Sequence, residues 1–155
     1  MRAQSIKTER GPVINLDTPD ILKRARYELS RNNAVLLRVT GAAMRPAIED
    51  GDLVTVEPVH ASSVRSGDIV LYQSLRDTAL IHRIVRLEQR SAGRFVVTRG
   101  DASLALDVPV PIHHVMGRVS AIDRDGQRTE VKPQPGGFKG KLIALLERFG
   151  LRRQG

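Results

Sequence analysis

The chain has 155 residues, enough for one compact domain, with a formal net charge of +8 and only 3% aromatic residues. Cysteine is absent, which excludes disulfides, zinc-finger spacings and thiol catalysis. The positive charge favours an anionic partner, but no aromatic residues are interleaved with the basic ones as stacking platforms for single-stranded nucleic acid, so no nucleic acid partner is expected.

The N-terminal part divides into a polar segment and a helix. Residues 1–17 have no apolar run typical of a signal peptide and are expected to form a flexible terminus. Residues 17–33, DTPDILKRARYELSRNN, predict a helix, because their apolar residues recur at helical spacing. The residues that share this face are Ile21, Leu22, Ala25 and Leu29.

A series of short β-rich runs follows, separated by Gly, Pro, Asp and Ser. The runs cover residues 34–40, 52–58, 68–74, 79–89, 94–100 and 115–124. Asp125-Gly126 is a strong signal for a two-residue hairpin turn. The sequence therefore predicts a mainly β fold, with residues 18–132 forming one domain that includes the leading helix.

The last segment, residues 133–155, reads as a Pro/Gly linker and a basic amphipathic helix. Such a helix can pack on the β domain, lie on a membrane surface or dock a partner, and these three interpretations stay open. No run approaches the roughly 20 apolar residues that span a bilayer. A cytoplasmic location is expected, with peripheral membrane contact through residues 138–153 as the alternative.

Four short motifs follow one another through the β-rich part. They are GAAMRPAIEDGD at residues 41–52, Gly67-Asp68, His82-Arg83, and Gly100-Asp101 with Asp107 downstream. In this order and spacing they resemble the signal peptidase I family and its relatives, serine peptidases that share a fold with LexA-type autoproteases. The resemblance implies coiled antiparallel sheets of the LexA/signal peptidase type.

The resemblance covers residues 35–123 and also assigns a catalytic base. His82 stands where the family carries its base, as in the His-type branch of archaeal and endoplasmic-reticulum signal peptidases. In that branch an Asp assists the His; Asp107 matches this carboxylate, and Asp101 is the alternate. A neutral imidazole can accept a hydroxyl proton near neutral pH, and a carboxylate fixes its tautomer.

One position departs from the family pattern. The nucleophilic Ser stands immediately before Met in the first motif, and this chain has Ala43 there. Alanine has no group that can attack a carbonyl. Two explanations stay open: a Ser-to-Ala change that traps substrate or stops self-cleavage, and a natural pseudoenzyme. Because His82, Asp101 and Asp107 are all present, the first is favoured.

The resemblance also implies how a substrate binds. The peptide lies as an extended strand beside the nucleophile, with small side chains just before the cut. The residues expected beside it are Gly41, Ala42, Met44, Pro46 and Ile81.

The expected function is a serine endopeptidase of the Ser-His-Asp type that cleaves a peptide or leader after small residues, here in an inactive form. The alternative is a natural pseudoenzyme that binds peptides. A LexA-type repressor half is disfavoured, because only one helix precedes residue 34. No cofactor or metal is expected, since His60, His113 and His114 lack ligand-like spacing.

Overall fold

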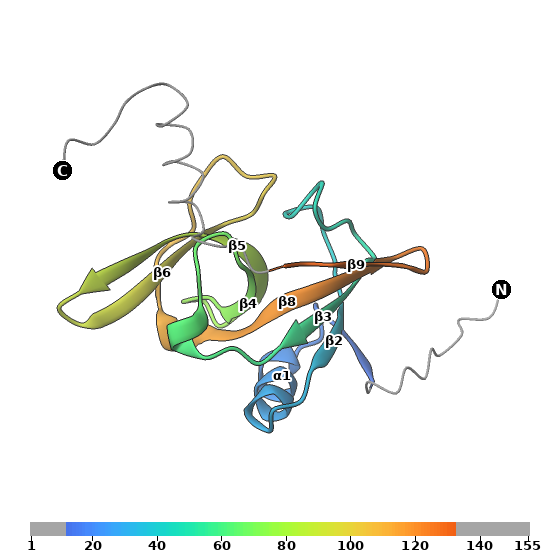
Figure 1. The fold of residues 1–155 in the computed structure, drawn as a ribbon, viewed down its shortest axis with the longest axis horizontal. Coiled ribbons are helices and arrows are strands. Elements are labelled where there is room, and N and C mark those ends of the chain that lie inside the picture. Colours follow the sequence, from blue (N-terminus) through green and yellow to red (C-terminus); the bar gives the residue numbers. More distant parts are fainter. Residues whose placement is uncertain (1–11, 133–155) are drawn as a thin grey trace.

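The computed structural model describes residues 12–132 (Figure 1). In chain order the elements, with η marking short 3-10 helices, are β1 (Val13–Asn15), α1 (Ile21–Ser30), β2 (Val35–Arg38), β3 (Leu53–Glu57), η1 (Ala61–Ser63), β4 (Ile69–Gln73), β5 (Ala79–Arg90), β6 (Gly93–Arg99), β7 (Val110–Pro111), η2 (Ile112–His114), β8 (Val115–Arg124) and β9 (Gln127–Glu130). All six predicted β-rich runs form strands. The mainly β class is therefore confirmed.

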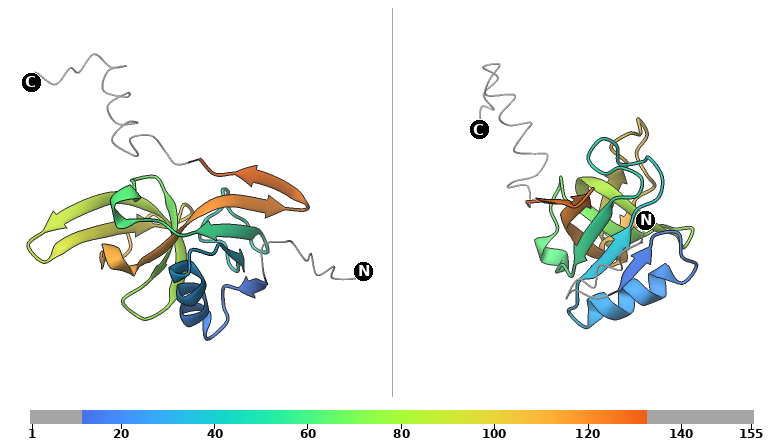
Figure 2. Two further views of the ribbon diagram at one scale, coloured as in Figure 1. Left: turned by 60° about the horizontal axis from the view of Figure 1, so that its bottom comes forward. Right: turned by 90° about the vertical axis from the view of Figure 1, so that its right-hand side faces the viewer.

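The strands form one curled sheet in the order β1-β2-β3-β8-β4-β5-β6-β7. Strand β9 lies off this path and pairs with β8, across β8 from β3. Every pairing is antiparallel except that of β1 with β2. Register shifts interrupt the pairing of β8 with β3 and β4, and of β5 with β6, and such bulges bend a sheet. The long hairpins β5–β6 and β8–β9 extend to opposite sides of the molecule (Figure 1, Figure 2).

Strand β4 separates two apolar clusters, because alternate residues of a strand point to opposite faces. Ile69 and Leu71 join the larger cluster with α1, β2 and β3. Val70 and Tyr72 join a smaller cluster with Ile84, Val96 and Val110. Burying one such aliphatic side chain contributes about 1.5 to 3 kcal/mol. The core is thus aliphatic, as a chain with few aromatic residues requires.

The helix is shorter than the predicted segment 17–33. Its apolar face is the expected one: Ile21, Ala25 and Leu29 are buried, and Leu22 packs against the same cluster. Figure 2 shows α1 lying against one side of the sheet.

The predicted flexible terminus needs a correction at its end. Val13–Asn15 form β1, which pairs with β2 and buries Ile14. One inward apolar residue in a three-residue strand is too weak a pattern to detect in the sequence.

The predicted hairpin turn is confirmed. Asp125 and Gly126 have φ values of 51° and 78°, and Arg124 pairs with Gln127 across them. Positive φ at both central residues is the requirement of a type I′ turn.

Within residues 12–132 no helix is long and apolar enough to cross a bilayer. The predicted helix and linker of residues 133–155 lie outside the described residues, and so does the membrane contact expected at residues 138–153. Those expectations stay predictions.

Candidate functional site

The loop between β2 and β3, residues 39–52, is held by its own acidic residues. The Asp50 carboxylate accepts the Gly41 N–H at 2.8 Å, and the Asp52 carboxylate accepts the Glu49 N–H at 2.8 Å. Arg124 reaches Asp52 from β8 with its Nη2 at 2.7 Å. Burial alone would raise the pKa of Asp52, but its hydrogen bonds from Arg124 and Glu49 outweigh burial and hold that pKa below its usual range.

Two apolar side chains anchor the same loop to the core. Met44 is 3% exposed and Ile48 1% exposed, whereas Ala42 and Ala43 are exposed. The loop therefore inserts the methionine and presents the residue before it at the surface. This explains why an apolar Met stands in a surface connection between two strands.

A second loop, residues 100–109, packs its main chain on Ala43. The Ala102 N–H donates to the Ala43 carbonyl at 3.0 Å, and the Asp101 N–H contacts the Met44 sulfur at 3.4 Å. A Cβ added at Gly100 would lie 2.7 Å from the Ala43 carbonyl oxygen. Only glycine permits this approach without a shift of the backbone.

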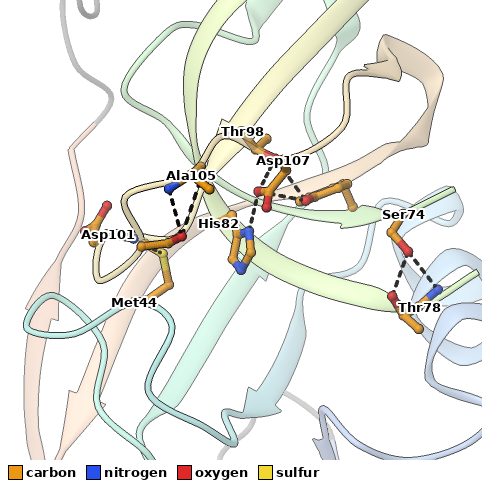
Figure 3. A network of polar contacts seen from close by, with 10 residues as sticks. Met44, Ser74, Thr78, His82, Thr98, Asp101, Ala105 and Asp107 are labelled. Carbon is orange, nitrogen blue, oxygen red and sulfur yellow. Dashed lines mark hydrogen bonds and ion pairs between the residues drawn. The ribbon is translucent and has the colours of Figure 1, made fainter. Parts of the chain in front are cut away.

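His82, on β5, bonds to Asp107 from this second loop. The distance from His82 Nδ1 to Asp107 Oδ2 is 2.5 Å, and the imidazole is 12% exposed (Figure 3). The Asp107 N–H donates to the Thr98 carbonyl at 2.9 Å, which fixes the return of the loop beside β6. Among residues 12–132, Nε2 of His82 makes no hydrogen bond.

The sheet register brings His82 to the same place as Ala43. Arg83 on β5 pairs with Arg99, the last residue of β6. The next step along both strands sets His82 beside Gly100, because antiparallel partners change by one residue in opposite directions. Gly100 in turn contacts Ala43. The histidine and position 43 thus flank one glycine.

Two buried hydroxyls also meet at Asp107, and the sequence did not single them out. Asp107 Oδ2 lies 2.8 Å from Thr98 Oγ1 and 3.2 Å from the Tyr72 hydroxyl. The two hydroxyls are 2.9 Å apart, and both residues are 1% exposed. Burial, with the charge of Asp107 beside it, raises the pKa of Tyr72 well above its usual range, so the phenol stays protonated.

The alternate carboxylate, Asp101, faces Arg83 and not His82. Arg83 Nε and Nη2 donate to its two oxygens at 2.8 Å each, and Nη1 donates to the Gly67 carbonyl at 3.0 Å. These bonds from Asp101 raise the pKa of Arg83 above its usual range. Asp101 therefore braces the loop, and the carboxylate on His82 is Asp107.

The residues expected beside a substrate fall into two groups. Gly41, Ala42 and Pro46 are exposed on the first loop. Met44 and Ile81 are 3% and 4% exposed and pack in the larger core cluster, so they support the site from beneath. The burial of Met44 was expected, and a role of these two residues beside the substrate stays a prediction.

The remaining histidines do not form a metal centre in the part of the chain that is described. His114 Nδ1 lies 2.8 Å from the Gln73 carbonyl. Residues 12–132 contain no group of three or more His, Cys, Asp or Glu side chains suited to hold a metal ion.

Comparison with protein families matches residues 12–98 to the family described as Peptidase S24-like. The match covers more than half of the chain and includes Ala43 and His82, and it ends before Asp101 and Asp107. No curated protein matches the chain. On its fold and on this match, the chain belongs to the Peptidase S24-like family.

Proposed function

We propose that the chain is a signal-peptidase-like serine endopeptidase of the Ser-His-Asp type that cleaves a peptide or leader after small residues, in a form that Ala43 makes inactive. The observation that carries the proposal is that His82, paired with Asp107, and residue 43 both adjoin Gly100. The family membership supports a serine-peptidase type of chemistry.

The chemistry requires a hydroxyl on residue 43. With serine there, Nε2 of His82 would take the hydroxyl proton while Oγ forms a bond to the scissile carbonyl carbon. Asp107 would hold the proton on Nδ1 and stabilise the imidazolium. The imidazolium would then give its proton to the leaving amine as the carbon–nitrogen bond breaks. His82 would next take a proton from the water that attacks the acyl ester and return it to Oγ, which releases the acid product. The main-chain N–H of residue 43 is the proposed donor to the developing oxyanion.

The binding surface is proposed along β5. This strand begins at Ala79, whereas β6 ends at Arg99 opposite Arg83, so residues 79–82 extend past the end of β6. An extended peptide can pair with such an edge. Gly41 and Ala42 are small and exposed, so a peptide backbone can approach the first loop closely, and the preference for small side chains before the cut is carried over from the family resemblance.

The second loop adds an apolar surface near Asp107. Leu104 is fully exposed, Val108 is 67% exposed and Leu106 47% exposed. Exposed apolar side chains gathered on one loop can mark a contact site. They support a substrate with an apolar segment, as a leader peptide has.

A second candidate function is a peptide-binding module without catalysis. Ala43 itself favours it, because the removal of a nucleophile leaves only binding and oxyanion stabilisation. The two candidates share the same proposed binding surface and differ in whether a hydroxyl at residue 43 restores cleavage.

The test is the Ala43→Ser variant, incubated alone and with leader-like peptides that carry Ala or Leu at the expected cleavage position. We expect cleavage of the Ala peptides, and no product with Ala43→Ser/His82→Ala. Ala42→Ser is the matched control, because it places the same hydroxyl one residue away. If Ala43→Ser binds peptide and yields no product, the binding module replaces the peptidase.

A further inference from the structure

Asp107 is held by more than the histidine. Its Oδ2 atom receives three contacts: His82 Nδ1 at 2.5 Å, Thr98 Oγ1 at 2.8 Å and the Tyr72 hydroxyl at 3.2 Å. The three partners come from β5, β6 and β4. Figure 3 shows the carboxylate of Asp107 between the Thr98 and His82 side chains. The loop residue is thereby tied to three adjacent strands of the sheet.

The number of available protons limits which groups in this cluster can donate hydrogen bonds. A carboxylate can only accept, and each hydroxyl carries one proton. Both hydroxyls can donate to Asp107, or one of them can donate to Asp107 while the other donates to its neighbouring hydroxyl. In both arrangements at least one buried hydroxyl donates to Oδ2. The Nδ1 position of His82, at 2.5 Å from the same atom, must then also be a donor.

We propose that Tyr72 and Thr98 are positioning residues that fix the Asp107 carboxylate, so that His82 keeps its proton on Nδ1 and offers Nε2 as the acceptor. Each hydroxyl is buried on a rigid strand, whereas Asp107 stands on a loop and is 26% exposed. Without the hydroxyls the carboxylate is free to turn to other rotamers, and the imidazole loses its fixed partner. The catalytic consequence, and only that, rests on the proposed function.

The first test uses the chain as it stands, with Ala43, and needs no catalysis. The ¹⁵N shifts of the imidazole nitrogens are measured at alkaline pH, where a histidine is neutral, in Thr98→Val, Thr98→Ser and Tyr72→Phe. His82 is identified among the four histidines by the loss of its signals in His82→Ala. Thr78→Val is the matched control, because the Thr78 hydroxyl bonds Ser74 in an exposed turn that Figure 3 shows apart from His82.

The expected result is one tautomer, protonated at Nδ1, in the unchanged chain, in Thr98→Ser and in Thr78→Val. Thr98→Val and Tyr72→Phe should give averaged signals from two tautomers. Unchanged His82 shifts in both variants would overturn the proposal. If Thr98→Val does not fold, Tyr72→Phe, which removes only the hydroxyl, decides alone.

The second test asks for the catalytic consequence in the Ala43→Ser background. Thr98→Val should lower kcat by roughly 10-fold to 100-fold with little change in KM, the range expected for a misplaced catalytic group. Thr98→Ser should restore the rate. If Ala43→Ser is inert, the proposed function fails, while the tautomer measurement still decides the positioning role. Equal kcat in Thr98→Val and its parent would refute that role in catalysis.

Discussion

The contact between Gly100 and Ala43 can be tested by Gly100→Ala, which adds one methyl group where the loop of residues 100–109 packs on the loop of residues 39–52. In Gly100→Ala the new Cβ would lie 2.7 Å from the Ala43 carbonyl oxygen and 3.4 Å from the Ala43 Cβ. An ordinary contact between carbon and a carbonyl oxygen is about 3.3 Å or longer. The loops must therefore separate by about 0.6 Å, and the atom in the way is backbone, which cannot rotate aside.

The cost follows from two terms. Inserting a methyl into a packed site costs about 1 to 3 kcal/mol. Weakening the hydrogen bond from Ala102 N–H to the Ala43 carbonyl costs about 1 kcal/mol more. The sum is a loss of about 2 to 4 kcal/mol in the free energy of unfolding, which lowers Tm by about 4 to 16 °C in a chain of this size.

The assay is thermal unfolding, together with peptide cleavage in the Ala43→Ser background. Gly126→Ala is the control, because its added Cβ meets nothing within 4 Å and only its backbone, at φ +78°, is strained. Both variants should lose stability, but only Gly100→Ala should lose cleavage at a temperature where it remains folded. A Gly100→Ala protein with unchanged Tm and unchanged cleavage would show that the loops do not meet as described.

Two further predictions concern the ion pairs that hold these loops. The pKa of Asp52 is lower in the folded chain than in the unfolded one. The ionised carboxylate therefore stabilises the fold fully above the unfolded pKa of about 4, and this contribution is lost as the pH falls through the folded pKa. Arg124→Gln should destabilise the chain near neutral pH, and the loss measured by urea unfolding should shrink once the pH falls through the folded pKa of Asp52. An equal loss at both pH values contradicts the pairing. Arg83→Lys removes the bidentate bond to Asp101, which holds the second loop. Hydrogen exchange at the Ala102 amide, which bonds the Ala43 carbonyl, should become faster, whereas the exchange rates of amides in α1 should not change.

The strands were predictable because each carries its own pattern. Runs such as residues 68–74 are rich in β-branched and aliphatic residues and end at Gly, Asp or Ser, so type and position follow from local sequence. Strand β9, Gln127–Glu130, has no such pattern, and all of its residues are exposed. It is a strand because the Asp125-Gly126 turn folds it back onto β8.

The candidate site was predictable only where a motif marks it. His82 and Asp107 are 25 residues apart, and their pairing was expected from the resemblance, not from any local pattern. Tyr72 and Thr98 lie inside apolar β-rich runs, where an aromatic and a β-branched residue pass as ordinary strand residues. Their hydroxyls acquire a role only when β4, β6 and the loop of Asp107 come together, which is a property of the tertiary structure.

The polar cluster at His82 is difficult to explain as a device for stability. Taking a carboxylate and an imidazole out of water is costly, and apolar replacements of similar volume are often neutral or better. Yet this chain has a His82–Asp107 pair and a glycine, Gly100, that packs on residue 43. This combination is the one that the proposed peptidase function requires once residue 43 carries a hydroxyl, so Ala43→Ser is its direct test.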